Sequence, residues 1–193
     1  MALEYTGHII LSWLTFLSQV AIGLFVLVLV TGLYKKSFFS KLILFAQKHA
    51  VGLSFLVALV STGGSLYYSE IIGFEPCRLC WYQRILMYPQ VLLIGTALLK
   101  KRKDIFTYLA PLCILGLLIS GYHYGIQTLY SQGVGVSDSC NATGTSCVSS
   151  EFLELNYITI PLMAFTGFLL ILVLTLLRRK MQAIDEKKKP ARA

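Results

Sequence analysis

The chain has 193 residues, of which 56% are hydrophobic, and its mean hydropathy is +0.70. Soluble domains carry about 45–50% apolar residues, so this composition excludes an ordinary soluble domain and indicates an integral membrane protein. The formal net charge of +8 does not indicate a nucleic-acid-binding protein, because the basic residues gather in short segments between or after apolar stretches.

Five apolar stretches are long enough to cross a bilayer as helices, which takes about 20 residues. They are residues 8–33, 50–72, 81–99, 105–128 and 157–177. Strands of a membrane barrel are shorter, with apolar and polar residues alternating over about 10 positions. The sequence therefore predicts an all-α membrane protein, with a four-helix transmembrane bundle plus one additional N-terminal transmembrane helix.

Residues 1–34 contain the first of these stretches. No basic residue precedes it and Lys35 and Lys36 follow it, which is the reverse of a secretory signal peptide. We therefore expect a retained N-terminal transmembrane helix that serves as an anchor or in packing. Residues 35–48 mix basic and apolar side chains and are predicted to form a cytoplasmic amphipathic linker in the headgroup plane.

The basic residues also predict the orientation of the chain in the membrane. Of the 17 Lys and Arg residues, all except Arg78 and Arg84 lie in segments that belong to one side of a five-helix topology. The positive-inside rule assigns that side to the cytoplasm. The C-terminus, with the basic tail 181–193, is then cytoplasmic, and the N-terminus and the loops 73–79 and 129–156 are extracytoplasmic.

Cys77, in the loop 73–79, and Cys80, directly after that loop, lie at the start of the third stretch. Pro76 does not fit inside a helix and favours extended backbone before it, so the helix is expected to begin at or just after Cys77. Both sulfurs then lie in the first helical turn, where the helix dipole favours a thiolate. Arg84 follows Cys80 by four residues and shares its helix face, and an arginine at that depth indicates a polar function.

The fourth stretch contributes Cys113 and His123. Cys113 lies near the inner half of its helix, far from the other cysteines, and is expected to be an inert buried thiol. His123 is expected at roughly the depth of Arg84. Because polar groups at membrane depth are candidates for function, we treat His123 as a candidate for the same binding pocket as Arg84.

The loop 129–156 is polar, rich in Gly, Ser and Thr, and carries Cys140 and Cys147. One interpretation of the two external cysteine pairs is an electron relay, because thiol–disulfide exchange passes two electrons between pairs. A quinone is the lipid-soluble two-electron acceptor, and Arg84 is a suitable hydrogen-bond donor. One alternative is a non-catalytic membrane interaction protein with structural disulfides, which leaves Arg84 without a role. Another is a zinc site using four thiolates, which is unusual for a loop with so few other ligands.

The stretch from Glu75 to Arg84, EPCRLCWYQR, followed by a second external cysteine pair before the last span, resembles the DsbB family of disulfide-bond-forming membrane oxidoreductases. The resemblance covers about residues 49–180, the predicted four-helix redox domain. It implies an enzyme of the bacterial inner membrane that oxidises an extracytoplasmic DsbA-like thioredoxin-fold dithiol protein. It also implies that the electrons pass to ubiquinone or menaquinone.

The resemblance further implies a role for each cysteine. Cys77 and Cys80 would form the quinone-coupled disulfide, with Cys80 as the thiolate that contacts the quinone ring and Arg84 as its supporting cation. Cys140 would form the mixed disulfide with the partner protein, and Cys147 would be its disulfide mate. No metal is expected.

Two features depart from the best-known members of the family. The helix before residue 35 has no counterpart in four-helix members, and the segment between Cys140 and Cys147 is short, which points to the shorter-loop members. A vitamin-K-epoxide-reductase-like enzyme also has a helical bundle and two cysteine pairs. Its quinone-side Cys-x-x-Cys normally comes late in the chain, whereas here that motif precedes the loop pair.

Overall fold

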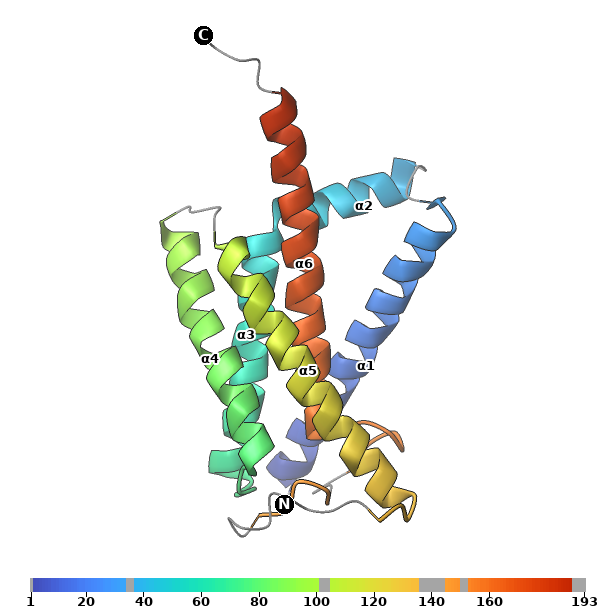
Figure 1. Ribbon diagram of the computed structural model, residues 1–193, viewed down its shortest axis with the longest axis vertical. Coiled ribbons are helices and arrows are strands. Elements are labelled where there is room, and N and C mark those ends of the chain that lie inside the picture. Colours follow the sequence, from blue (N-terminus) through green and yellow to red (C-terminus); the bar gives the residue numbers. More distant parts are fainter. Residues whose placement is uncertain (1, 34–36, 101–104, 136–144, 150–152, 189–193) are drawn as a thin grey trace.

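The structure is a computed structural model that describes residues 2–33, 37–100, 105–135, 145–149 and 153–188. The described residues form six α-helices and no extended strand; one isolated bridge joins Glu154 and Ile158. The helices are α1 (Ala2–Val30), α2 (Ser37–Lys48), α3 (Ala50–Leu66), α4 (Arg78–Leu99), α5 (Phe106–Ser131) and α6 (Ile160–Lys188) (Figure 1). This arrangement confirms the prediction of an all-α membrane protein.

Four helical segments of the described chain are long and apolar enough to cross a membrane: Thr6–Val30, Ala50–Ile71, Phe106–Ser131 and Ile160–Lys180. The second of them is α3 together with the helical turn that follows it. The remaining predicted span, 81–99, corresponds to α4. With 22 residues, α4 has the length to cross a bilayer, but Gln83, Arg84 and Gln90 make it more polar than the others. Gln83 and Gln90 are buried and therefore face the interior of the bundle.

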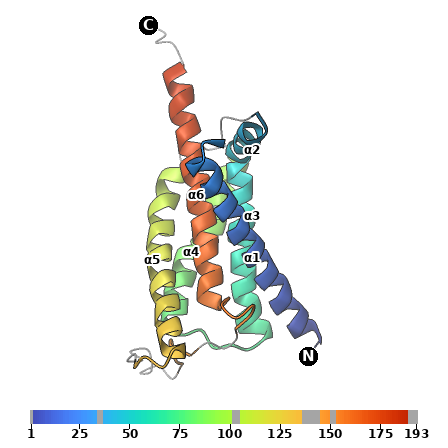
Figure 2. The same ribbon diagram turned by 90° about the vertical axis from the view of Figure 1, so that its right-hand side faces the viewer.

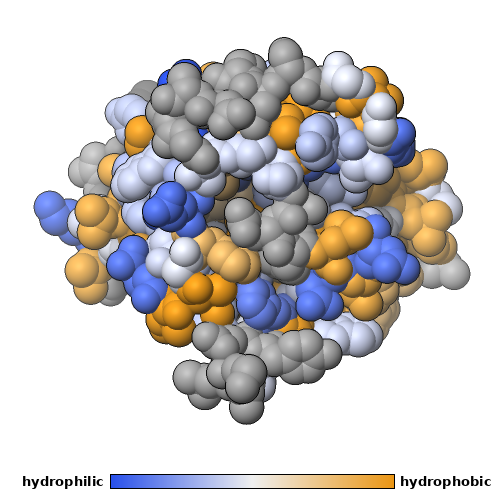
Figure 3. All heavy atoms as spheres, turned by 90° about the horizontal axis from the view of Figure 1, so that it is seen from below, coloured by the Kyte–Doolittle hydropathy of each residue, from blue (hydrophilic) through white to orange (hydrophobic). Residues whose placement is uncertain are grey.

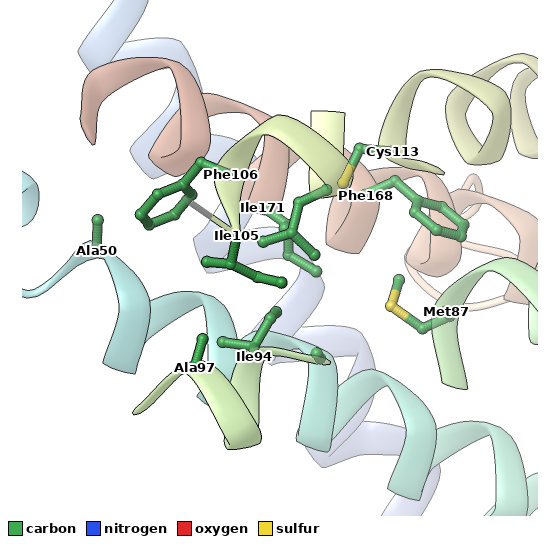
Figure 4. Close-up of a cluster of buried hydrophobic side chains, with 11 residues drawn as sticks. Ala50, Met87, Ile94, Ala97, Ile105, Phe106, Cys113, Phe168 and Ile171 are labelled. Carbon is green, nitrogen blue, oxygen red and sulfur yellow. The ribbon is translucent and has the colours of Figure 1, made fainter. Parts of the chain in front are cut away.

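Helices α3 to α6 pack together as the bundle, with α6 against both α3 and α5 and with α4 against α3 and α5 (Figures 1 and 2). A hydrophobic core fills the end of the bundle where the chain passes from α4 to α5 (Figure 4). Ile94, Leu109 and Ile171 are fully buried there. Phe168 of α6 packs over Gly116 of α5, where any Cβ would overlap its ring, so glycine permits the close approach of these helices.

Helix α2 joins α1 to the bundle and crosses the direction of the other helices (Figure 1). Its last turn contacts α6, where Arg178 Nη1 donates to the Gln47 carbonyl at 3.2 Å. Phe38, Leu42 and Phe45 are exposed, as an amphipathic helix on a lipid surface requires. The place of α2 in the headgroup plane remains a prediction.

Helix α3 ends in a π-helical turn, η2 (Tyr67–Ile71), which the sequence did not indicate. The chain then reverses through Gly73, whose φ of 84° is readily adopted only by glycine, and enters α4. This reversal, the loop after α5 and the N-terminus all lie at one end of the molecule, at the bottom of Figure 1, which we call the cysteine end. Figure 3 views this end directly and shows hydrophilic and hydrophobic residues side by side on its surface.

Candidate functional site

Cys77 is the N-cap residue of α4, with extended backbone angles (φ −66°, ψ 171°). Helix N-caps are usually Ser, Thr, Asp or Asn, whose side-chain oxygen accepts a backbone N–H. Here the Cys77 sulfur takes this place and accepts the Cys80 N–H at 3.5 Å. The helix therefore begins just after Cys77, as Pro76 predicted, and a backbone donor at its N-terminus points at the sulfur.

Cys77 and Cys80 are free thiols whose sulfur atoms lie 3.3 Å apart and are hydrogen-bonded. Cys77 is buried, with 4% of its surface exposed, and Cys80 is half-buried. The structure thus holds this pair in the dithiol form, and the Cys77–Cys80 disulfide remains a prediction for the oxidised form.

The hydrogen bond with the Cys80 thiol is the largest of the effects that lower the pKa of the Cys77 thiol well below its usual range. Burial opposes this effect, and the contacts with His123 and the Cys80 backbone N–H reinforce it. In the reduced pair a thiolate is therefore favoured on Cys77. The resemblance implied Cys80 as the thiolate beside a quinone. That role of Cys80 belongs to a different state of the protein, in which Cys77 is bonded to another sulfur.

His123 of α5 connects the two cysteine loops. It is almost fully buried (1% exposed), and its Nδ1 lies 3.0 Å from Gln83 Nε2. Its Nε2 lies 3.1 Å from the Cys147 carbonyl oxygen and 3.8 Å from Cys77 Sγ. Because a carbonyl oxygen only accepts, Nε2 carries the proton and Nδ1 accepts from the Gln83 amide.

Arg84 is held against α3. Its Nη2 donates to the Ser65 carbonyl at 3.1 Å, and its guanidinium carbon lies 5.5 Å from the centroid of the Trp81 ring, within the range of a cation–π contact. Tyr88 donates to the Ser65 hydroxyl at 3.1 Å. The π-helical turn begins two residues after Ser65, and such turns are frequent at functional sites.

A cavity of about 350 Å³ opens beside these residues. Its polar end is formed by Cys77, Cys80, Arg84, His123 and Gln127, and its other walls are mainly apolar side chains of α1, α3 and α6. An apolar cavity of this size with a few convergent polar groups is typical of a small-molecule site. The structure thus places the candidate residues Cys77, Cys80, Arg84 and His123 around one cavity.

Cys147 lies next to this site. It is disulfide-bonded, 1% exposed, and packs in one buried cluster with Cys77 and Ile126. Thr145 donates to Glu75 Oε2 at 3.3 Å, which ties the second cysteine loop to the first. Gln127 of α5 donates to the Ser149 carbonyl at 3.2 Å and holds the same loop from the other side.

Cys140 lies outside the described residues, so its predicted disulfide with Cys147 and its role toward a partner remain predictions. Cys113 lies in the hydrophobic core, fully buried, with its sulfur 3.5 Å from Gln90 Oε1. It does not line the cavity; its burial agrees with the expectation, and its inertness remains a prediction.

The sulfurs of Cys77 and Cys80 and one imidazole nitrogen of His123 lie within 4.8 Å of one another, an arrangement that could hold a soft metal ion. Structural zinc sites take four protein ligands. In the described part of the chain no further Cys, His, Asp or Glu joins this group. The Nε2 proton of His123 is also directed at the Cys147 carbonyl, so the arrangement favours thiol chemistry over a structural zinc site.

The sequence analysis did not identify Gln83, Gln127 or Ser65. Gln83 and Gln127 offered a weak signal, because each is an uncharged polar residue within a predominantly apolar helix. The Ser65 carbonyl offered none, because its role depends on the packing of α3 against α4.

Comparisons with known proteins identify the family of the chain. The family model for the disulfide bond formation protein DsbB matches residues 47–177. Curated relatives include the probable disulfide formation protein C 1 of Bacillus cereus (41% identical over 66% of this chain and 89% of the relative) and the disulfide bond formation protein C of Bacillus subtilis (42% over 62% and 85%). No solved structure matches. The chain belongs to the DsbB family of disulfide-forming membrane proteins, as its Cys-x-x-Cys motif and second cysteine pair suggested.

Proposed function

We propose that this protein is a quinone-dependent thiol oxidase of the bacterial inner membrane. Its substrate is an extracytoplasmic DsbA-like thioredoxin-fold protein in the dithiol form. Electrons pass from that protein to Cys140/Cys147, then to Cys77/Cys80, and then to ubiquinone or menaquinone. The observation that carries the proposal is the burial of Cys77 against Cys147 at the polar end of an apolar cavity that also contains Arg84.

The first exchange oxidises the partner. A thiolate of the partner attacks Cys140 of the Cys140–Cys147 disulfide, which forms a mixed disulfide and releases Cys147 as a thiolate. The second cysteine of the partner then attacks its own half of the mixed disulfide and releases Cys140. The partner leaves with a disulfide, and two electrons remain on Cys140 and Cys147.

The second exchange moves these electrons inward. Cys147 attacks Cys77 of the Cys77–Cys80 disulfide and releases Cys80 as a thiolate, one helical turn before Arg84. Cys140 then attacks Cys147, which restores the outer disulfide and releases Cys77. The contact between Cys77 and Cys147 supports Cys77 as the atom attacked, and the lowered pKa of Cys77 makes it a good leaving group.

His123 positions this exchange. Its Nε2–H group donates to the Cys147 carbonyl and lies 3.8 Å from Cys77 Sγ, so one proton faces both sulfur-bearing residues. The hydrogen bond from Gln83 to Nδ1 fixes the ring and the tautomer. A neutral imidazole held in this way stabilises negative charge on Cys77 when it leaves.

The cavity fits a quinone by the chemistry of its lining. Arg84 carries five N–H donors, and one of its nitrogens donates to Ser65, so the guanidinium can also donate to a quinone carbonyl. Cys80 stands at the same end of the cavity and apolar walls follow. When bound, a quinone supplies the acceptor for the two electrons and two protons of the Cys77/Cys80 dithiol.

The test measures quinone reduction by the purified protein, with a reduced DsbA-type protein as substrate. The loss of quinone absorbance reports the reaction. We expect one quinone reduced for each disulfide formed in the partner. The Cys147→Ala variant should accumulate a mixed disulfide between Cys140 and the partner, and Cys113→Ala should retain both steps. A folded protein that reduces no quinone and traps no partner contradicts the proposal.

A further inference from the structure

Helix α1 lies outside the part of the chain that matches the DsbB family, which begins at residue 47. It nevertheless forms part of the wall of the cavity beside the cysteines, through Leu11, Leu14, Thr15 and Ser18. A helix that is additional to the family domain therefore closes one side of the domain's own site.

Specific contacts hold α1 in this place. Gln19 Nε2 donates to Thr166 Oγ1 of α6 at 3.2 Å, and Tyr157 donates to Gln19 Oε1 at 2.9 Å. Toward the cysteine end, Gly7 packs against the Tyr67 ring so closely that a Cβ would overlap it. Between these points Leu11 contacts Gly64 of α3. The register of α1 along the cavity is thus fixed on both sides of the lining residues.

The wall that α1 contributes is apolar in its chemistry. Leu11 and Leu14 present hydrocarbon. The hydroxyls of Thr15 and Ser18 donate to carbonyls of their own helix, Leu11 O at 2.8 Å and Leu14 O at 2.7 Å, so their protons are already used. This part of the cavity is suited to a hydrocarbon chain.

The cavity is also longer than a quinone ring needs. Its lining on α3 runs from Leu56 to Ser65, about 13 Å along the axis at 1.5 Å per residue. Arg84 and the cysteines occupy only the Ser65 end. The stretch near Leu56 has apolar neighbours, including Val57, Val60 and Leu170.

We propose that α1 completes the binding site for the isoprenoid tail of the quinone, between α3 and α6, and makes the protein selective for long-tailed quinones. This inference rests on the proposed function, because it assumes that the quinone ring lies at Cys80 and Arg84. Leu14, Thr15 and Ser18 are then specificity-determining residues of α1.

The matched test replaces adjacent residues of α1 in the full-length protein in lipid nanodiscs. Ser18→Phe places a ring in the tail part of the cavity, and Leu17→Phe, at a residue that is 57% exposed and does not line the cavity, is its control. We expect Ser18→Phe to raise the KM for a long-tailed quinone about tenfold. The KM for a quinone with the same ring and a short tail should change less than about twofold, and Leu17→Phe should change neither KM.

Leu14→Ala removes part of the cavity wall without adding bulk. We expect this variant to raise the KM for the long-tailed quinone about threefold. The variant keeps the test decisive should Ser18→Phe misfold.

Binding is read independently of turnover with a quinone that carries a photoreactive diazirine on its tail. We expect crosslinked peptides from residues 11–18 in the wild-type protein, and their loss in Ser18→Phe but not in Leu17→Phe. Labelling confined to α3 and α6, or an equal rise in KM for both quinones, overturns the role of α1 and leaves the proposed oxidase intact. A wild-type protein that neither binds the probe nor reduces any quinone overturns both proposals.

Discussion

The described part of the chain contains two buried free thiols in different surroundings, and their comparison shows what makes a cysteine reactive here. Cys113 is fully buried in the hydrophobic core with only the Gln90 side chain as a polar contact. Cys77 is nearly as buried, but it caps a helix and contacts Cys80 and His123. Burial alone disfavours a thiolate, whereas donors aimed at the sulfur favour it. The neighbours therefore distinguish the two thiols.

The largest expected effect is the difference in the rate of quinone reduction between variants of these two thiols. Cys77→Ser should lower the rate of quinone reduction by at least about a thousandfold, because the sulfur that Cys147 attacks in the second exchange is lost. Cys113→Ser should stay within about twofold of wild type. Steady-state quinone reduction with a reduced thioredoxin-fold substrate measures both. Equal losses in the two variants would remove the distinction between them.

The second prediction concerns pH. In the reduced protein, alkylation of Cys77 by iodoacetamide should show an inflection well below the usual thiol pKa of about 8.5, because the pKa of Cys77 is lowered. Because the Cys80 thiol is the largest cause of the lowering, Cys80→Ala should move the inflection upward, toward that usual value, by at least about two pH units. Mass spectrometry of the Cys77 peptide after timed labelling gives the profile. An inflection that stays at the wild-type pH in the variant shows that Cys80 is not the cause.

Arg84 tests the quinone side of the site. Arg84→Gln should lower kcat/KM for the quinone about 10- to 100-fold, which is the scale of one charged hydrogen bond. Single-turnover oxidation of the partner by the resting enzyme should change little, because Arg84 faces α3 and the cavity. An equal loss of quinone reduction and of partner oxidation would indicate that Arg84 mainly stabilises the fold. In that case Arg84→Lys should restore both activities in part.

His123 tests the link between the two cysteine loops. His123→Phe removes the hydrogen bonds with Gln83 and the Cys147 carbonyl and should slow electron transfer from the outer pair to the inner pair about tenfold. Stopped-flow measurement of a single turnover reports this step. The KM for quinone is expected to remain within about twofold of wild type, and a rise in KM alone would assign His123 to quinone binding instead.

The smallest expected effect on turnover comes from a substitution in the hydrophobic core. Gly116→Ala places a methyl group against Phe168 and should destabilise the protein by about 1–3 kcal/mol through overpacking. Turnover per folded molecule should be unchanged. Thermal unfolding in detergent measures the first quantity and quinone reduction the second. A variant as stable as wild type would show that α5 and α6 separate easily at this point.

Much of the architecture could be predicted from the sequence, because its signals are local. Apolar runs of about 20 residues indicate membrane helices whatever they pack against, and Pro76 marks the start of α4 at Cys77. The depth of His123 along its helix was enough to place it near Arg84. These features follow from position along a helix alone.

Other features depend on contacts between distant segments and left little trace in the sequence. The pairing of Gln83 with His123 requires α4 and α5 to meet at one angle. The π-helical turn Tyr67–Ile71 has no clear residue signature. The part of α1 in the cavity wall was also missed, because its Leu, Thr and Ser residues read equally well as packing positions. Cys140 lies outside the described residues, so its predicted roles await experiment.

The central claim is that electrons from the outer cysteine pair enter the inner pair at Cys77. It is tested most directly by mild oxidation of the Cys80→Ser/Cys140→Ser double variant, in which Cys77 and Cys147 keep only each other as nearby exchange partners. Peptide mass spectrometry should find the two cysteines joined in most molecules, with Cys113 still a free thiol. A folded double variant in which Cys77 and Cys147 both remain free thiols after oxidation would contradict the account.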